Sequence, residues 1–127
     1  MAIRNILRDD DPALSKKSRD VIDFDKRLHM LLNDMRETLI KADGLGLAAV
    51  QVGVLRRVAL IVDTSIDAIL PEDQIIELIN PKIIGSSGKQ TGIEGCLSVP
   101  GVYGTVSRPD FVKVSAQDRD GNTFEMW

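Results

Sequence analysis

The sequence has a single cysteine, at position 96, and a single histidine, at position 29. One cysteine cannot form an internal disulfide, so the expected compartment is the reducing cytoplasm. No apolar run approaches the ~20 residues that are needed to span a bilayer. The apolar stretch near the N-terminus is too short for a signal peptide, and acidic residues follow it at once. We therefore expect a cytoplasmic protein that does not enter a membrane.

Basic residues are too sparse for a nucleic-acid-binding surface. The net charge is -3 and the pI is near 5.1, and the densest basic cluster consists of Lys16, Lys17 and Arg19. Internal repeats, low-complexity tracts and linkers are also absent, and 127 residues suffice for one hydrophobic core. We expect one domain over residues 1–127 and no nucleic-acid partner.

A helix is predicted from about Phe24 to Lys41. Asp23 or Asp25 is placed to cap its start, and Gly44 follows its end. His29 falls at the flank of the apolar stripe, which indicates a boundary or surface histidine rather than a metal ligand. The stripe repeats at steps of three and four residues and consists of Leu28, Leu31, Leu32, Met35 and Leu39.

The remaining periodicity is that of strands. Before the helix, residues 7–20 read as irregular, with a turn at Asp11-Pro12. After it, β-branched apolar runs and alternating patterns indicate antiparallel sheet, and the class is α+β. The expected elements are a strand over 57–62 buried on both faces, a surface loop over 64–74, a strand over 75–79 ended by Asn80-Pro81, a strand over 82–84, and a hairpin whose strands 112–117 and 123–127 flank a turn at 118–121.

The stretch GLGLAAVQVG, residues 44–53, is the first informative motif. Gly44, Gly46 and Ala49 fit the dinucleotide fingerprint G-x-G-x-x-G/A, but here a helix precedes the glycines and a strand follows them. The order is the reverse of what phosphate binding at a helix N-terminus needs, so nucleotide binding is rejected. Gln51 offers a neutral amide donor that suits a developing oxyanion. Alternatively, the stretch is a turn with an incidental glutamine.

The stretch EGCLSVP, residues 94–100, surrounds the cysteine. Taken alone, Cys96 is a small core thiol, an exposed reactive thiol that senses redox state, or a metal ligand.

Together, the two motifs resemble the first two signature motifs of the peptide deformylases. These are metallohydrolases that remove the formyl group from the initiator methionine of new proteins. The matching residues are Gly44, Gly46, Ala48, Ala49 and Gln51 in the first motif, and Glu94, Gly95, Cys96, Leu97 and Ser98 in the second. The segments between and after the motifs also resemble that family, so the resemblance covers essentially the whole chain.

The resemblance implies a role for six residues. Cys96 would be a metal ligand for Fe²⁺, Zn²⁺, Ni²⁺ or Co²⁺, and the metal would turn its bound water into hydroxide at neutral pH. Gln51 and the backbone N–H of Leu97 would hold the oxyanion formed from the formyl carbonyl. The backbone near Leu45, Gly46 and Gly95 would pair with the peptide as an added strand, and an apolar pocket would take the methionine side chain. The partners would be formyl-methionine N-termini of nascent chains beside the ribosome.

The family's third motif, H-E-x-x-H on a helix, is missing. We expect a chain that is truncated at its C-terminus, lacks the metal-binding helix, does not retain the metal and is inactive as it stands. The alternative is a non-catalytic peptide-binding remnant of the fold. Apolar sheet surface that the helix would cover is expected to drive self-association. Of the other motif residues, Glu94 is expected to orient backbone, Arg108 to pair with a carboxylate, and Tyr103 has no assigned role.

Overall fold

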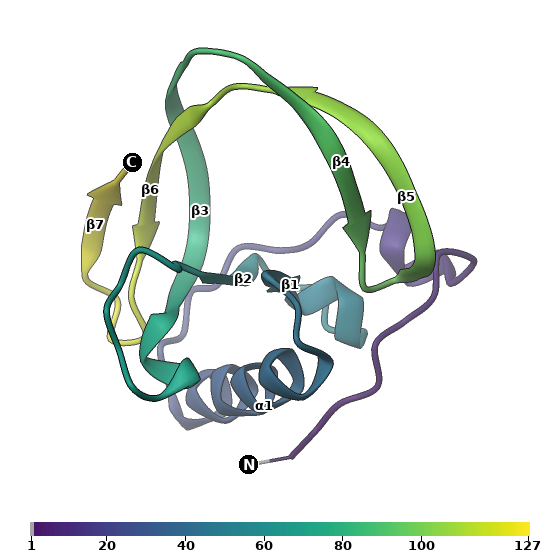
Figure 1. The fold of residues 1–127 in the computed structure, drawn as a ribbon. Coiled ribbons are helices and arrows are strands. Elements are labelled where there is room, and N and C mark those ends of the chain that lie inside the picture. The colour runs from purple at the N-terminus through teal and green to yellow at the C-terminus, as the bar shows by residue number, and fades with distance from the viewer. Residues whose placement is uncertain (1) are drawn as a thin grey trace.

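The computed structural model describes residues 2–127, which form one α-helix and two antiparallel sheets (Figure 1). The larger sheet has the strand order β1-β2-β3-β6-β7, and β4 pairs with β5 alone. This confirms the α+β class with mainly antiparallel sheet. The elements are η1 (Pro12–Ser15), α1 (Lys26–Ala42), β1 (Gly46–Ala48), η2 (Ala49–Val52), β2 (Val58–Val62), η3 (Pro71–Gln74), β3 (Ile75–Ser87), β4 (Gln90–Cys96), β5 (Val99–Arg108), β6 (Phe111–Gln117) and β7 (Thr123–Met126).

Helix α1 confirms the periodicity of its sequence. The helix begins after Asp25, whose carboxylate accepts the N–H of Leu28 at 3.1 Å, and it ends at Asp43 in the left-handed conformation. The half-buried His29 donates from Nε2 to the carbonyl oxygen of Arg119 at 2.8 Å, so it is the predicted boundary histidine. The apolar stripe packs on β1, β2 and β3, where the core includes Leu32, Met35, Leu39, Leu47, Leu60 and Ile79. Neither α1 nor any other described helix has the length and apolar character needed to cross a membrane.

The predicted strand end at Asn80-Pro81 is wrong, because β3 runs without interruption through Ser87. Asn80 has a φ of 52°, and the pairing with β6 shifts register between Ile79 and Lys82. Asn80 and Pro81 therefore form a bulge within one long strand. The Asn80 side chain also exchanges two hydrogen bonds of 2.8 Å with the backbone of Val21, which ties the N-terminal segment to the sheet.

Strands β4 and β5 form a long ribbon that the sequence patterns did not predict. Figure 1 shows β3 and β6 bending over the body of the molecule and continuing into the β4–β5 ribbon, which descends to the N-terminal segment. Nearly every residue of β4 and β5 is exposed. The sequence of the ribbon therefore lacks the alternation of buried and exposed positions by which a strand is predicted. A smaller error concerns β2, where Val58 and Leu60 are buried but Ala59 and Ile61 are only partly so. That strand is covered fully on one face, not on both.

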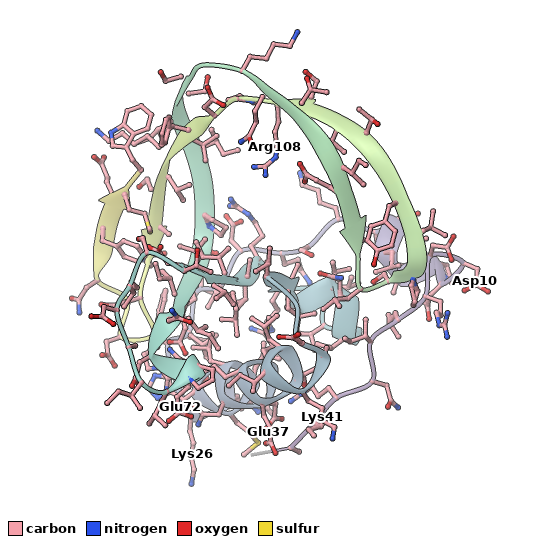
Figure 2. The ribbon with its side chains drawn as sticks, in the orientation of Figure 1. Asp10, Lys26, Glu37, Lys41, Glu72 and Arg108 are labelled. Carbon is pink, nitrogen blue, oxygen red and sulfur yellow. The ribbon has the colours of Figure 1, made fainter. Side chains whose placement is uncertain are left out.

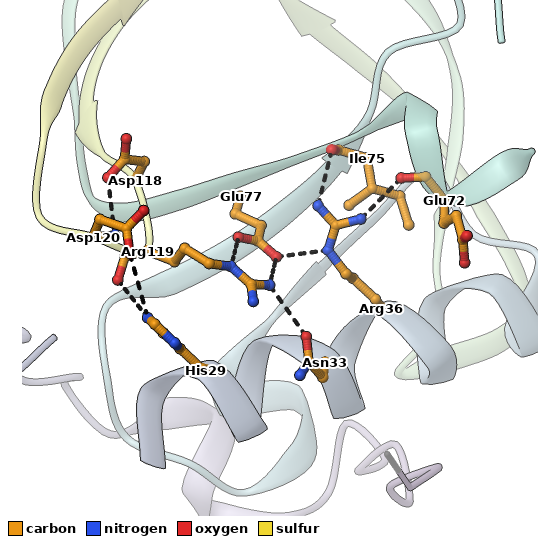
Figure 3. A network of polar contacts seen from close by, with 9 residues as sticks. All are labelled: His29, Asn33, Arg36, Glu72, Ile75, Glu77, Asp118, Arg119 and Asp120. Atoms are coloured by element: carbon orange, nitrogen blue, oxygen red, sulfur yellow. Dashed lines mark hydrogen bonds and ion pairs between the residues drawn. The ribbon is translucent and has the colours of Figure 1, made fainter. Parts of the chain in front are cut away.

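The predicted hairpin over residues 112–127 is confirmed as β6 and β7, and a largely buried carboxylate joins it to α1 (Figure 3). Glu77 on β3 accepts from Arg36 Nε of α1 at 2.6 Å and from Arg119 Nε of the hairpin turn at 2.9 Å. Its side chain is 9% exposed. Burial by itself raises the pKa of Glu77, but the hydrogen bonds from Arg119 and Arg36 outweigh it and hold the pKa below the usual 4.5.

We expect Glu77→Gln to lower the free energy of unfolding at pH 7 by about 2–3 kcal/mol, because two arginines lose their charged acceptor. Since the pKa of Glu77 is lower in the folded state, its contribution is present above pH 4.5 and is lost as the pH falls through the folded value. Urea unfolding at pH 7 and at lower pH measures both effects. Glu125→Gln, which breaks an exposed pair with Lys113, is the control and should cost less than about 1 kcal/mol. Equal losses in the two variants would contradict this account.

Candidate functional site

All six residues predicted for the site line one groove of about 630 Å³. The groove lies between the β1–η2 segment and the end of the β4–β5 ribbon. Leu45, Gly46 and Gln51 come from the first motif, and Gly95, Cys96 and Leu97 from the second. The structure therefore brings the two motifs together, while the roles of the six residues stay predictions.

The orientation of the Gln51 side chain is determined by its backbone neighbour Ala48. The N–H of Ala48 donates to Gln51 Oε1 at 2.9 Å, so the NH₂ group faces the ribbon. There Gln51 Nε2 donates to Ser98 Oγ at 3.1 Å and lies 3.7 Å from Cys96 Sγ. An amide donor is thus held beside the thiol at the groove. The α1–β1–η2 order also agrees with the rejection of a nucleotide site, since the helix precedes the glycines.

Cys96 is exposed, so its interpretation as a core thiol is wrong. The next residue, Leu97, packs against the hydrophobic core and anchors the turn between β4 and β5. Gly44 makes room for that anchor, because a Cβ there would lie 2.7 Å from Leu97 Cδ1 and 3.3 Å from Leu39 Cδ1. The packing of the partly buried Leu97 against the core therefore leaves Cys96 at the surface of the groove.

Strand β1 is an edge strand whose free side faces the groove. Among the described residues 2–127 it pairs with β2 only, and the carbonyl of Leu45 accepts the N–H of Val62 at 2.9 Å. Antiparallel pairing uses alternate residues, so the backbone groups of Gly46 point away from β2. They are available to an extended peptide, as is the unpaired edge of β4 that contains Gly95. Tyr103 covers Gly95, since a Cβ at that glycine would lie 2.8 Å from the tyrosine ring.

Ser98 also belongs to the candidate site, although the sequence assigned no role to it. It is 4% exposed, and its hydroxyl accepts one hydrogen of the Gln51 amide. Its place in the second motif was visible in the sequence. Its partner was not, because Gln51 lies 47 residues earlier.

Arg108 has the carboxylate partner that was predicted for it. Its Nε donates to Glu94 Oε2 at 2.7 Å across the ribbon, and Figure 2 shows Arg108 pointing beneath the arch that the ribbon forms. Glu94 was expected to orient backbone, but its carboxylate instead accepts from this side chain. The pair is partly exposed, with side-chain accessibilities of 54% and 40% for Arg108 and Glu94.

The donor set around Cys96 does not fit a divalent metal. Residues 2–127 contain no group of three or more His, Cys, Asp or Glu side chains that is placed to hold one. A catalytic zinc takes three protein ligands and keeps one position open. Cys96 supplies one thiolate, and the sole histidine, His29, is hydrogen-bonded to Arg119 in the β6–β7 hairpin turn.

Comparisons with known proteins agree on one family. The family model described as Polypeptide deformylase matches residues 3–127. A peptide deformylase of Alkaliphilus metalliredigens is 51% identical over 126 residues, which cover 99% of this chain and 80% of that protein. The crystal structure of a peptide deformylase from Legionella pneumophila superposes with a TM-score of 0.88 at 44% identity and covers 98% of this chain and 71% of that one. A peptide deformylase from Ehrlichia chaffeensis in complex with actinonin gives a TM-score of 0.88 at 37% identity, with 99% and 74% covered.

We expect Gly44→Ala to destabilise the chain by about 1–3 kcal/mol, because the new methyl group must displace Leu97 or Leu39. The displacement of Leu97 should also shift the NMR resonance of the Gln51 side-chain amide. Gly92→Ala on β4 is the control, since a Cβ there meets nothing within 4 Å. Urea unfolding and ¹H–¹⁵N spectra of both variants test this expectation, and matching behaviour of the two would contradict it.

Proposed function

Because the chain belongs to the polypeptide deformylase family, we propose that it serves the removal of the formyl group from formyl-methionine at the N-termini of nascent proteins in the cytoplasm. We propose further that the 127 residues by themselves bind such N-termini without hydrolysing them. The observation that carries the proposal is the 3.7 Å separation of Gln51 Nε2 from Cys96 Sγ at the groove.

Gln51 is suited to stabilise an oxyanion. Tetrahedral intermediates of amide hydrolysis carry negative charge on the former carbonyl oxygen, and preorganised neutral donors stabilise that charge. The Gln51 amide is preorganised by Ala48 and Ser98, which hold its oxygen and one of its hydrogens. A formyl oxygen placed beside Cys96 would meet this amide on one side. The backbone N–H of Leu97 follows Cys96 directly and is the proposed second donor.

The two strand edges support binding of the peptide as an added strand. Gly46 on β1 and Gly95 on β4 present backbone groups to the same groove, and neither has a side chain that would keep a peptide at a distance. Leu45, which is 73% exposed, adds apolar surface at the groove. We propose that the methionine side chain lies against apolar groove surface of this kind.

The metal that the family implies is not assigned to these residues alone. In the family, the H-E-x-x-H motif is expected to supply two imidazole ligands and a proton-shuttling glutamate from one helix. This sequence holds a single histidine, His29, which is not part of such a motif. One thiolate is too few ligands for a catalytic divalent ion. We therefore propose that the 127-residue chain does not retain the metal.

The test is a parallel measurement of binding, metal content and turnover on the purified chain. We expect formyl-Met-Ala-Ser to shift the backbone resonances of Gly46 and Gly95 and the Gln51 side-chain amide, whereas formyl-Asp-Ala-Ser should bind much more weakly. After incubation with Fe²⁺ or Zn²⁺ and dialysis, the metal content should be well below one ion per chain, and no formate should be released. Stoichiometric metal with formate release would contradict the proposed inactivity. Absence of peptide binding would contradict the proposed function.

We also propose that the chain associates with itself through the β4–β5 ribbon. Side chains alternate between the two faces of a strand, so Ile93 and Val106 lie on opposite faces of the ribbon. They are 77% and 37% exposed. A two-stranded ribbon with uncovered apolar residues is marginally stable by itself and favours association.

We expect the mass measured by light scattering to rise above the 14.0 kDa of one chain as the protein concentration increases. The double variant Ile93→Lys, Val106→Lys should weaken this association. Ile69→Lys, at a loop position that is fully exposed, is the control and should leave it unchanged. A mass that stays at one chain at all concentrations would rule the association out.

A further inference from the structure

The N-terminal segment, residues 2–20, runs past the lower end of the β4–β5 ribbon (Figure 1), and its Ile6 lines the groove. The segment is held at both ends. At its start, the N–H of Ala2 donates to Asp34 Oδ1 and the N–H of Arg4 donates to Thr38 Oγ1, each at 2.8 Å. Both acceptors lie on α1 and are buried. At its end, the N–H of Arg19 donates to the carbonyl of Leu55 at 3.0 Å. The path of the segment is therefore held by the body of the fold.

Between these ends, the segment contacts both halves of the groove through its backbone. The N–H of Leu7 donates to the carbonyl of Gln51 at 2.7 Å, and the N–H of Asp9 donates to the carbonyl of Ser98 at 3.0 Å. Gln51 and Ser98 are the same two residues whose side chains bond to each other at 3.1 Å. They are thus joined twice, directly through side chains and indirectly through residues 7–9.

The second connection matters because the ribbon has few other constraints at this end. Strands β4 and β5 pair only with each other, whereas the other five strands share one sheet. At this end of the ribbon, the side chains of Cys96, Leu97 and Ser98 contact the body, and the carbonyl of Ser98 is bonded to the N-terminal segment. Figure 2 shows Asp10, the neighbour of Asp9, beside this end of the ribbon.

We propose that residues 7–9 act as a positioning element for the oxyanion-stabilising amide. The N–H of Asp9 holds the ribbon turn and the N–H of Leu7 holds η2, which sets the separation of Gln51 from Cys96. The importance of this separation for the reaction rests on the proposed function. The position of the Gln51 amide relative to Cys96 does not rest on it, and that position can be probed without turnover.

The sharpest test is the pair Asp9→Pro and Asp9→Ala in the full chain. Asp9 is the second residue of a turn in which the N–H of Asp11 donates to the carbonyl of Arg8 at 3.0 Å. Proline is favoured at that position, so Asp9→Pro keeps the turn and removes the N–H that reaches Ser98. Asp9→Ala removes the side chain and keeps the N–H, which makes it the matched control.

In Asp9→Pro, we expect a shifted Gln51 side-chain amide resonance, about fivefold faster hydrogen exchange of that amide, and about fivefold weaker binding of formyl-Met-Ala-Ser, since one hydrogen bond is lost. Asp9→Ala should behave as the unchanged chain in all three measurements. If Asp9→Pro lowers only the free energy of unfolding and leaves the Gln51 amide and the peptide affinity unchanged, the segment is merely structural and the proposal is overturned. Equal effects in Asp9→Ala would overturn it as well.

If Asp9→Pro does not fold, Leu7→Pro tests the proposal instead. This variant removes the N–H that donates to the carbonyl of Gln51, and the same three measurements apply to it. Failure of the proposed function would look different. In that case the unchanged chain would not bind the formylated peptide, while the resonance and the exchange rate of the Gln51 amide would still report whether residues 7–9 position it.

Discussion

The Gln51 carboxamide connects two parts of the molecule that no strand pairing joins. Its oxygen accepts from the backbone of Ala48, so its amino group must face the ribbon, where it meets Ser98 and lies beside Cys96. Each of these partners occupies a separate sheet or turn. This contact, the packing of Leu97 on the core and the hydrogen bond from the N–H of Asp9 to Ser98 together fix the distance between the ribbon end and the edge of β1. A neutral amide suits the task, since it needs no charged partner to remain at a partly exposed site.

The body of the fold gives that contact a rigid base. The largely buried carboxylate of Glu77 lies between α1 and the β6–β7 hairpin, and it forms ion pairs with Arg36 and Arg119 (Figure 3). The same helix holds the start of the N-terminal segment through Asp34 and Thr38. Helix, sheet and segment are therefore linked to one another, and η2 with Gln51 lies between them.

The groove has more groups that suit peptide binding than groups that could bind a metal. Amide donors and unpaired strand edges are present, and these suit alignment of a peptide and stabilisation of a developing oxyanion. Among the described residues at the groove, the donor set for a metal is limited to Cys96, although the chain belongs to the polypeptide deformylase family, which implies a divalent metal. The side chains of Ile93 and Val106 are left at the surface of the ribbon. The described residues at the groove thus suit the proposed recognition of a peptide better than they suit metal chemistry.

The sequence by itself determined helix α1, the β6–β7 hairpin, the family and six of the residues that line the groove. These follow from short-range periodicity, as in the stripe that ends at Leu39, and from two gapless motifs that contain Gln51 and Cys96. Only the tertiary structure decided that Asn80 bulges a strand instead of ending it and that residues 90–108 form an exposed ribbon. It alone also placed Ser98 and the backbone of Asp9 around Gln51. The reason is that these features depend on hydrogen bonds between residues far apart in the chain, and no local pattern encodes them.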